Sequence, residues 1–205
     1  MNKKKGFFLT FEGPEASGKS SQIKLLEKYL KQKNISYITT REPGGTKLAE
    51  ALRELILKVK SNININEEIL MLMAARSHHI NTVIKPALIN GKLVISDRFA
   101  DSTFVYQGYV NKFGILNAKT LHKKILNNFL PNKTFLFELS SSQILLRLKK
   151  RKNKSKYDKL EKKFHNEVNK GYELISNNKR FIKIDASKPI DSIHKKIISH
   201  INLLI

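Results

Sequence analysis

Apolar positions along the chain change between strand-like runs and helix-like spacing, and this change predicts the order of the elements. An apolar run at 6–11 is typical of a buried strand, and Ile23, Leu26 and Leu30 follow it at helical spacing. A second strand is predicted at 35–40, and a helix with one apolar face comes after it. The first part of the chain therefore predicts strand, helix, strand and helix in succession.

The remainder of the chain continues this alternation. A long helical pattern begins at Glu67, bends near Pro86 and ends at Asn90 and Gly91. The later predicted elements are a strand at 93–96, a helix at 116–129, a strand at 134–139, a helix from 141, a strand at 181–184 and a final helix. Such alternation predicts an α/β fold with a mainly parallel five-stranded sheet flanked by helices on both faces.

Length and composition favour one globular domain. The chain of 205 residues is 40% hydrophobic and contains no Gly/Ser-rich or Pro-rich linker, so we expect a single domain over residues 1–205. It has no cysteine, which fits a reducing compartment, and we expect a cytoplasmic location. The basic start meets Glu12 too soon to form a signal peptide. No apolar run approaches the about 18 residues that cross a bilayer, so we expect no membrane association.

The chain is strongly basic, with 39 Lys and Arg against 17 Asp and Glu and a formal net charge of +22. Such a surface could collect nucleic-acid phosphates. However, lysine, asparagine and isoleucine are abundant throughout, as a compositional bias would produce, and no basic stripe is interleaved with aromatic residues. We therefore expect no nucleic-acid partner. The most basic segment, at about 149–163, is either a lid over a site or a solvated loop and helix face.

The segment Gly13–Ser20 matches the phosphate-binding pattern G-x-x-x-x-G-K-[ST] and lies between a predicted strand and a predicted helix. In this pattern backbone N–H groups surround the β-phosphate, Lys19 neutralises β/γ charge and Ser20 is a ligand for Mg²⁺. The predicted ATP-binding residues are Gly13, Pro14, Glu15, Ala16, Ser17, Gly18, Lys19, Ser20 and Ser21. The loop alone fits a kinase, a GTPase or an ATPase motor. A Ras-like GTPase is set aside because no Asn-Lys pair has Asp two places after the lysine.

Four further segments follow the phosphate-binding loop in a specific order. They are Arg41-Glu42-Pro43-Gly44-Gly45-Thr46, Ala74-Ala75-Arg76, Asp97-Arg98-Phe99 with Ser102 and Thr103, and Tyr106-Gln107-Gly108. Together with the loop, these segments resemble the thymidylate kinase family over essentially the whole chain. The resemblance implies a nucleoside monophosphate kinase fold, a homodimer, and transfer of a phosphoryl group from ATP to dTMP with Mg²⁺ as cofactor.

Two arginines and an aspartate stand at the ends of predicted strands, where ligands bind in open α/β sheets. The resemblance assigns Arg41 and Arg98 to the dTMP phosphate and makes both catalytic together with Lys19. Asp97 follows a strand at the usual place of a carboxylate that holds Mg²⁺. Alternatively, Arg41 belongs to a surface turn, and Asp97 and Arg98 pair with each other.

Leu72 and Arg76 share one helix face and could form a base pocket, one packing on the ring and the other donating to a thymine carbonyl. The family usually has phenylalanine at the Leu72 position. A plain core role for Leu72 is therefore an alternative, and so is a kinase for another nucleoside monophosphate. The other dTMP-binding residues that the resemblance implies are Thr103 on the base, Tyr106 near the sugar 2′ position, Glu15 on the 3′-hydroxyl, and Gln107. An unrelated structural role is the alternative for Glu15.

Ala16 occupies a loop position at which many relatives have arginine, and the resemblance is to bacterial enzymes whose lid supplies the catalytic charge. Arg147, Lys150 and Arg151 are the candidates, with Arg151 first because a planar guanidinium spans two oxygens. The segment 185–189 either places backbone against adenine or forms a plain turn. A rival of a different class is a basic nucleic-acid-binding protein whose phosphate-binding loop acts as a switch.

Overall fold

The centre of the molecule is a sheet of five strands in the order β2-β3-β1-β4-β5. The computed structural model describes residues 6–58, 63–150 and 161–203. The strands are β1 (Phe7–Glu12), β2 (Tyr37–Arg41), β3 (Leu93–Asp97), β4 (Lys133–Glu138) and β5 (Phe181–Asp185), and every neighbouring pair is parallel. The predicted fold class is confirmed, and each predicted strand overlaps an observed one.

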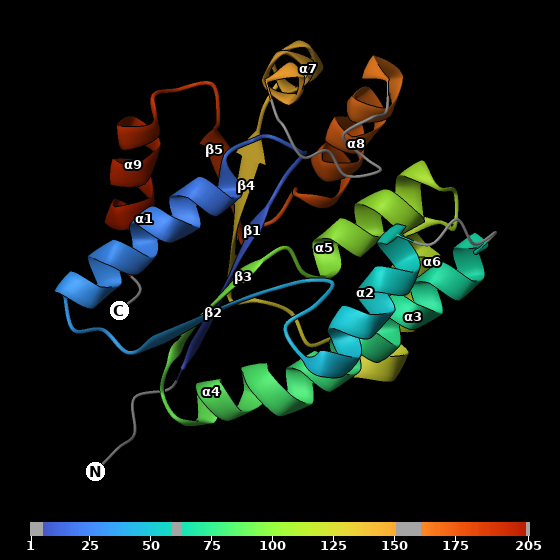
Figure 1. The fold of residues 1–205 in the computed structure, drawn as a ribbon, viewed down its shortest axis with the longest axis horizontal. Helices are drawn as coiled ribbons and strands as arrows, with labels where there is room; N and C mark the ends of the chain where they lie inside the picture. The colour runs from blue at the N-terminus through green and yellow to red at the C-terminus, as the bar shows by residue number, and fades with distance from the viewer. Residues whose placement is uncertain (1–5, 59–62, 151–160, 204–205) are drawn as a thin grey trace.

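Helices cover both faces of this sheet (Figure 1). One face carries α1 (Lys19–Gln32) and α9 (Ile190–Asn202). The other face carries α2 (Lys47–Lys58), α3 (Ile65–His79), α4 (Lys85–Ile89), α5 (Ala100–Thr103), α6 (Ile115–Leu126) and α8 (Lys162–Ile175). Helix α7 (Ser141–Lys149) lies beyond the carboxyl end of β4. Within the described ranges, no helix combines the length and the apolar character needed to cross a bilayer.

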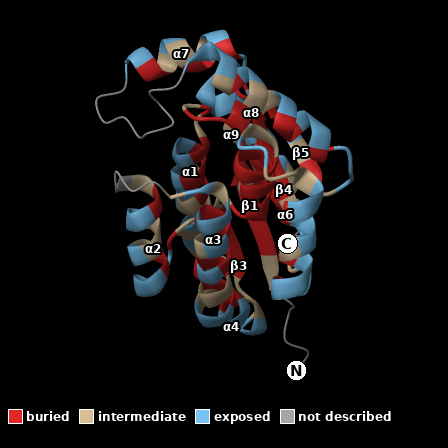
Figure 2. Ribbon diagram, turned by 90° about the vertical axis from the view of Figure 1, so that its right-hand side faces the viewer, coloured by how far each residue is buried: buried red, intermediate tan, exposed pale blue. Residues whose placement is uncertain are grey.

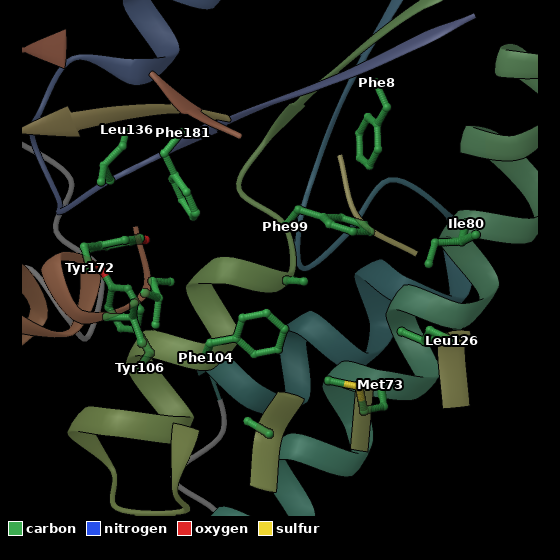
Figure 3. Close-up of a cluster of buried hydrophobic side chains, with 14 of the residues drawn as sticks. Phe8, Met73, Ile80, Phe99, Phe104, Tyr106, Leu126, Leu136, Tyr172 and Phe181 are labelled. Carbon is green, nitrogen blue, oxygen red and sulfur yellow. The ribbon is translucent and has the colours of Figure 1, made fainter. Parts of the chain in front are cut away.

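Neighbouring side chains on the strands enter different hydrophobic clusters, as the two-residue period of a strand requires. Leu9 and Phe11 of β1 pack in the cluster that includes α1 and α9, whereas Phe8 packs with the helices of the opposite face. Figure 2 shows the buried strands between the helix layers, and Figure 3 shows the cluster that contains Phe8 and Phe99. Burial on both faces explains why β1, β3 and β4 appear in the sequence as apolar runs.

A π-helical segment interrupts the long helix that the sequence predicts from Glu67. Helix α3 begins at Ile65, two residues before the predicted start, because Asn64 caps it. The Asn64 side chain accepts a hydrogen bond from the backbone N–H of Glu67, and the Glu67 side chain accepts one from the backbone N–H of Asn64. The segment η1 (Ile80–Ile84) then separates α3 from α4. Pro86 has no N–H to continue the regular helical hydrogen bonding, so the irregularity expected near Pro86 lies just before it.

The sequence pattern predicts no helix between 97 and 115, yet α5 and the π-helical segment η2 (Phe104–Val110) occupy this stretch. Most of these residues are buried, so no polar face marks a helical period in the sequence. The predicted helix at 116–129 is also corrected at its end. Helix α6 stops at Leu126 because Asn127 and Asn128 take left-handed backbone conformations.

Candidate active site

A cavity of about 570 Å³ lies at the carboxyl ends of β1, β2 and β3, the edge at which open parallel sheets bind ligands. The predicted site residues that line it are Glu15, Ala16, Ser17, Gly18, Lys19, Ser20, Ser21, Arg41, Leu72, Arg76, Asp97, Arg98, Thr103, Tyr106 and Gln107. Gly13 and Pro14 are not part of this lining, and Arg151 lies outside the described residues. The structure thus brings the predicted ATP-binding and acceptor-binding residues to one cavity.

The phosphate-binding loop surrounds the amino end of α1 and is shaped by glycines. Gly13 and Gly18 have φ angles of 133° and 93°, and a Cβ on Gly13 would collide with a carbonyl oxygen of β4. Lys19 Nζ donates to the carbonyl oxygens of Pro14 at 2.7 Å and Gly13 at 3.1 Å. Burial, together with the nearby charge of Arg98, lowers the pKa of Lys19 to about 8.

Ser20 and Asp97, the two predicted metal ligands, meet at the cavity lining. Ser20 Oγ donates to Asp97 Oδ2 over 2.7 Å, so Asp97 pairs with Ser20 rather than with Arg98. Both side chains offer oxygen donors, and Mg²⁺ binds proteins through one or two oxygen groups plus substrate phosphates and water. The two residues therefore fit a magnesium ion. No group of three or more His, Asp and Glu side chains in the described ranges forms a separate metal site.

Arg98 is fixed beside the cavity from several elements. It follows β3 with a φ angle of 68°, in the left-handed region that few residues other than glycine occupy. Its Nη1 donates to the hydroxyls of Ser102 at 3.0 Å and Tyr172 at 3.1 Å. Its Nη2 donates to Glu15 Oε1 at 3.1 Å. Contacts from the phosphate-binding loop, α5 and α8 thus hold the Arg98 guanidinium in place.

Glu15 extends from the phosphate-binding loop to the same cluster. Its Oε1 accepts a hydrogen bond of 2.7 Å from Tyr106, in addition to the one from Arg98, whose guanidinium also lies over the Tyr106 ring. Its Oε2 is buried, has no hydrogen-bond partner within the described part of the chain, and lies 4.0 Å from Nδ1 of the buried His165. The Glu15 carboxylate therefore accepts hydrogen bonds from Arg98 and Tyr106 through Oε1, and its Oε2 stays available to accept another.

Arg76 lies on the buried face of α3 and is oriented by three neighbours. Its Nε donates to Glu42 at 2.7 Å, and its Nη2 donates to Thr103 Oγ1 at 2.8 Å and to the Phe99 carbonyl oxygen at 3.4 Å. Its Nη1 is buried and has no hydrogen-bond partner among the described residues. His79 also contacts Glu42 at 2.9 Å. Burial acts to raise the pKa of Glu42, but Arg76 and His79 outweigh it and hold that pKa below its usual value. One guanidinium nitrogen, Nη1, is thus left for a ligand.

These features combine a phosphate-binding loop with a second, arginine-lined pocket in one cavity. A model of the thymidylate kinase family matches residues 11–197. The chain belongs to the thymidylate kinase family. Members of this family phosphorylate dTMP to dTDP with ATP as the phosphoryl donor.

Relatives in this family cover almost the whole chain. The thymidylate kinase of Mycoplasma capricolum is 39% identical over 196 residues, which are 93% of this chain and 92% of the relative. The thymidylate kinase of Halothermothrix orenii is 37% identical and covers 94% of this chain and 95% of the relative. That of Clostridium novyi is 36% identical and covers 94% of this chain and 97% of the relative.

In this member of the thymidylate kinase family, Leu72 lies at the cavity one helical turn from Arg76. It is only 6% exposed, yet it belongs to neither of the two hydrophobic clusters of the core. Its position therefore favours the predicted pocket over the alternative of a plain core residue. Gln107 of η2 lies nearby at the cavity lining, where its Nε2 donates to Glu68 at 2.7 Å.

Arg41 reaches the cavity from the end of β2 and is largely exposed, with its Nη2 donating to Glu50 at 2.9 Å. The alternative of a surface turn is not supported, because Arg41 ends β2 and lines the site and the next residue, Glu42, is buried. Arg53 of α2 lines the same cavity and donates to the Pro43 carbonyl at 2.7 Å. The sequence does not single out Arg53, because it is one basic residue beside the apolar face of a helix.

Two of the three lid candidates of this kinase family member, Arg147 and Lys150, lie at the carboxyl end of α7. Arg147 donates to the carbonyl oxygens of Ala16 at 3.2 Å and Ala186 at 2.8 Å, so it joins the phosphate-binding loop to the loop after β5. Lys150 ends α7. Arg151 and most of the basic segment fall outside the described residues, and the choice of Arg151 stays a prediction.

Besides Arg53, sequence reasoning misses two residues of the site. Glu12 at the end of β1 is fully buried beneath Arg98, and the Tyr172 hydroxyl from α8 contacts both of them. A carboxylate at the end of an apolar strand is a signal that could have indicated Glu12. Nothing local indicates Tyr172, because its partners lie far from it in the sequence.

Proposed function

We propose that this chain transfers the γ-phosphoryl group of ATP to the phosphate of dTMP and forms dTDP in the cavity described above. The observation that carries this proposal is that the phosphate-binding loop and the arginines of the acceptor pocket open into one cavity. The reaction requires that the phosphates of ATP and of dTMP, which repel each other, be aligned with one another. Positioning and charge neutralisation supply most of phosphoryl-transfer catalysis, and no covalent nucleophile is needed.

On the ATP side, the loop backbone from Gly13 to Ser20 binds the β-phosphate, and Lys19 neutralises charge on the β- and γ-phosphates. Ser20 and Asp97 would hold Mg²⁺, which supplies charge neutralisation to the phosphates when bound. The oxygen donors and their mutual contact of 2.7 Å support this assignment. Ser21 extends the loop into the first turn of α1.

On the acceptor side, Arg41 and Arg98 bind the dTMP phosphate, and we add Arg53 because it lines the same part of the cavity. A guanidinium binds two phosphate oxygens at once, which fixes the direction of the acceptor oxygen. Arg98 has three hydrogen bonds within the protein, so its position is set before the substrate arrives. Preorganised charge of this kind costs no rearrangement during the reaction.

The base and sugar would lie between α3 and η2. The unused Nη1 of Arg76 donates to a thymine carbonyl, and Leu72 packs on the ring. Thr103 and Gln107 complete the polar rim of the base pocket. On the sugar, the unused Oε2 of Glu15 accepts from the 3′-hydroxyl, and Tyr106 crowds the 2′ position.

The proposal is tested by measuring ADP formation with ATP and Mg²⁺ while dTMP, dUMP, dCMP, dGMP, AMP and UMP are offered separately. We expect a strong preference for dTMP. Preference for another monophosphate would keep the kinase chemistry but overturn the assignment of the base pocket around Leu72 and Arg76. No turnover with any acceptor would overturn the proposed function. A Lys19→Met variant, which removes the charge on the transferring phosphates, controls for contaminating kinases.

We also propose that the protein acts as a homodimer in the cytoplasm. Leu70 of α3 and Leu116 of α6 are 56% and 76% exposed on helices that contact each other, and such exposed leucines support a helical dimer contact. Light scattering should give a mass of twice the 23.6 kDa chain. A monomer at micromolar concentration would contradict the dimer without affecting the proposed reaction.

A further inference from the structure

The backbone at Arg98 has a conformation that the chain must enforce. A non-glycine residue at a φ of 68° is disfavoured by its own Cβ, and such residues persist only where their surroundings over-determine them. Ser102 and Tyr172 orient the side chain, but neither contact fixes the peptide that follows Arg98. Ser96 Oγ donates to the carbonyl oxygen of this peptide at 2.7 Å. The group that holds the N–H of the peptide lies beneath it, in the core.

That group is Glu12, the last residue of β1. Its side chain is completely buried and accepts hydrogen bonds from donors on both sides of the site. Oε1 accepts from the backbone N–H of Phe99 at 2.7 Å and of Ser102 at 3.3 Å. Oε2 accepts from the hydroxyls of Ser102 at 2.7 Å and Tyr172 at 2.9 Å. One carboxylate thus binds the backbone after Arg98 and both hydroxyls to which Arg98 donates.

We propose that Glu12 is a positioning residue that holds Arg98 in the orientation needed to bind the acceptor phosphate. The inference rests on the proposed role of Arg98. The hydroxyls of Ser102 and Tyr172 each donate a hydrogen bond to Glu12. The lone pairs of these two hydroxyl oxygens are therefore directed to the Arg98 guanidinium, which can only donate. The hydrogen bond to the Phe99 N–H meanwhile stabilises the left-handed conformation of the preceding residue. Glu12 touches no substrate and acts through Arg98.

A purely structural role for Glu12 is the main alternative. Burial and the charge of Asp101 raise the pKa of Glu12 to about 7, so the ionised form is disfavoured in the folded protein. A group that only filled the core would be replaced there by an apolar side chain without this cost. Strongly perturbed carboxyl groups beside a ligand cavity are typical of functional sites.

The experiment is a double-mutant cycle between Glu12→Gln and Arg98→Ala, measured as kcat/KM for the acceptor at saturating ATP. Glutamine keeps the shape of the side chain but replaces one accepting oxygen with a donor. We expect Glu12→Gln alone to lower kcat/KM by at least about tenfold, with the KM for ATP changed less than about twofold. In the Arg98→Ala background the same change should lower kcat/KM by less than about threefold, because residues that act through one another are not additive.

Glu138→Gln is the matched control. Glu138 also ends a strand, β4, but it is half exposed and pairs with Lys183 at 3.1 Å away from this cavity. It should leave kcat/KM within about twofold of the unchanged protein. An equal loss from Glu12→Gln in both backgrounds would overturn the proposal, since Glu12 would then act independently of Arg98.

A second pair of variants covers the case in which Glu12→Gln does not fold. Tyr172→Phe and Ser102→Ala each remove one hydroxyl held by Glu12 and leave the carboxylate in place. Each should lower kcat/KM for the acceptor in the presence of Arg98 and have little effect in its absence; equal losses in both backgrounds would again refute the proposal. The cycle is run with whichever monophosphate the protein prefers, so a failure of the dTMP assignment is distinguishable from a failure of the Glu12 assignment.

Discussion

Lys19 illustrates how burial prepares a single residue for a charged ligand. In the folded protein its pKa is lowered to about 8, mainly by burial and then by Arg98, so part of the population is neutral at mildly basic pH. Anionic phosphates favour the charged form, so ATP binding should take up a proton above this pKa. We expect the affinity for ATP to fall by up to about tenfold for each pH unit above about 8.

Calorimetry of ATP binding at pH 8.5 in two buffers of different ionisation enthalpy measures this proton uptake directly. The apparent binding enthalpy should differ between the buffers in proportion to the proton taken up. Lys19→Met is the control, because it has no ionisable group at this position. Equal enthalpies in both buffers for the unchanged protein would show that Lys19 is fully charged before ATP binds.

Leu72 offers a second prediction at the residue scale. A leucine covers the thymine ring but lacks the aromatic contact that the family usually has, and such contacts contribute about 0.5–1.5 kcal/mol beyond buried area. We therefore expect Leu72→Phe to lower the KM for dTMP by about twofold to tenfold while kcat stays within twofold. Steady-state kinetics checks this. A raised KM would indicate that the cavity beside Arg76 has no room for the ring.

Most of the candidate site could be predicted from the sequence, because its motifs are local. The phosphate-binding loop and the Asp97-Arg98 segment each stand directly after a buried strand, where the fold makes a site. Glu12 is indicated only as a carboxylate at the end of an apolar strand, and nothing local indicates Tyr172. Their significance comes from contacts 160 residues apart along the chain, which neither periodicity nor a motif records.

At the scale of elements, α3 presents Leu72 and Arg76 to the cavity and depends on a defined start. The side chain of Asn64 accepts from the backbone N–H groups of Asn66 and Glu67, and losing such a cap costs about 1 kcal/mol. Asn64→Ala should therefore lower the free energy of unfolding by about 1 kcal/mol in urea denaturation. The neighbouring Asn66→Ala is the control, since the exposed Asn66 takes part in the cap only through its backbone. Equal effects of the two substitutions would argue against the cap.

Helix α7 joins two loops of the site through Arg147. Because Arg147 donates to the Ala16 and Ala186 carbonyls, it should hold the ATP-binding loops rather than act on the transferring phosphoryl group. We expect Arg147→Ala to raise the KM for ATP at least fivefold and to lower kcat much less. Arg151→Ala should do the reverse if Arg151 contacts mainly the transition state. Steady-state kinetics of both variants separates the two roles; a loss of kcat alone in Arg147→Ala would make Arg147 the catalytic lid residue.

The central strands β1, β3 and β4 were predictable at this scale because each is buried on both faces and leaves an apolar run. The stretch formed by α5 and η2 was not, since its burial comes from packing against α6 and α8 rather than from a local pattern. A π-helical turn also departs from the 3.6-residue period on which helix prediction depends. The segment carrying Tyr106 and Gln107 was therefore identified by its motif and not by its structure.

At the scale of the whole molecule, the buried charge at Glu12 links stability to pH. Its folded-state pKa of about 7 lies above the ordinary value of 4.5, so the folded protein binds more protons than the unfolded chain between these values. The stability contributed by protonated Glu12 is fully present below about pH 4.5 and is lost as the pH rises through about 7. The loss amounts to about 3 kcal/mol, since each pKa unit corresponds to about 1.4 kcal/mol.

Glu42 affects stability in the opposite sense, because its pKa is lowered in the folded protein. Its contribution to the free energy of unfolding is present above the ordinary pKa of 4.5 and is lost as the pH falls below that value. Between pH 5 and 7.5 the Glu12 contribution dominates this pair. His122, whose pKa is lowered to about 4 by burial, opposes it below about pH 6.5, so the Glu12 contribution is measured as a difference between variants. Glu12→Gln has no group to titrate at this position, so from pH 5 to 7.5 its urea-unfolding free energy should fall less, or rise more, than that of the unchanged protein, whereas Glu138→Gln should keep the original slope. Parallel slopes in all three proteins would mean that Glu12 is already ionised at pH 5. The four hydrogen bonds that the Glu12 carboxylate accepts would then stabilise its ionised form by more than burial destabilises it.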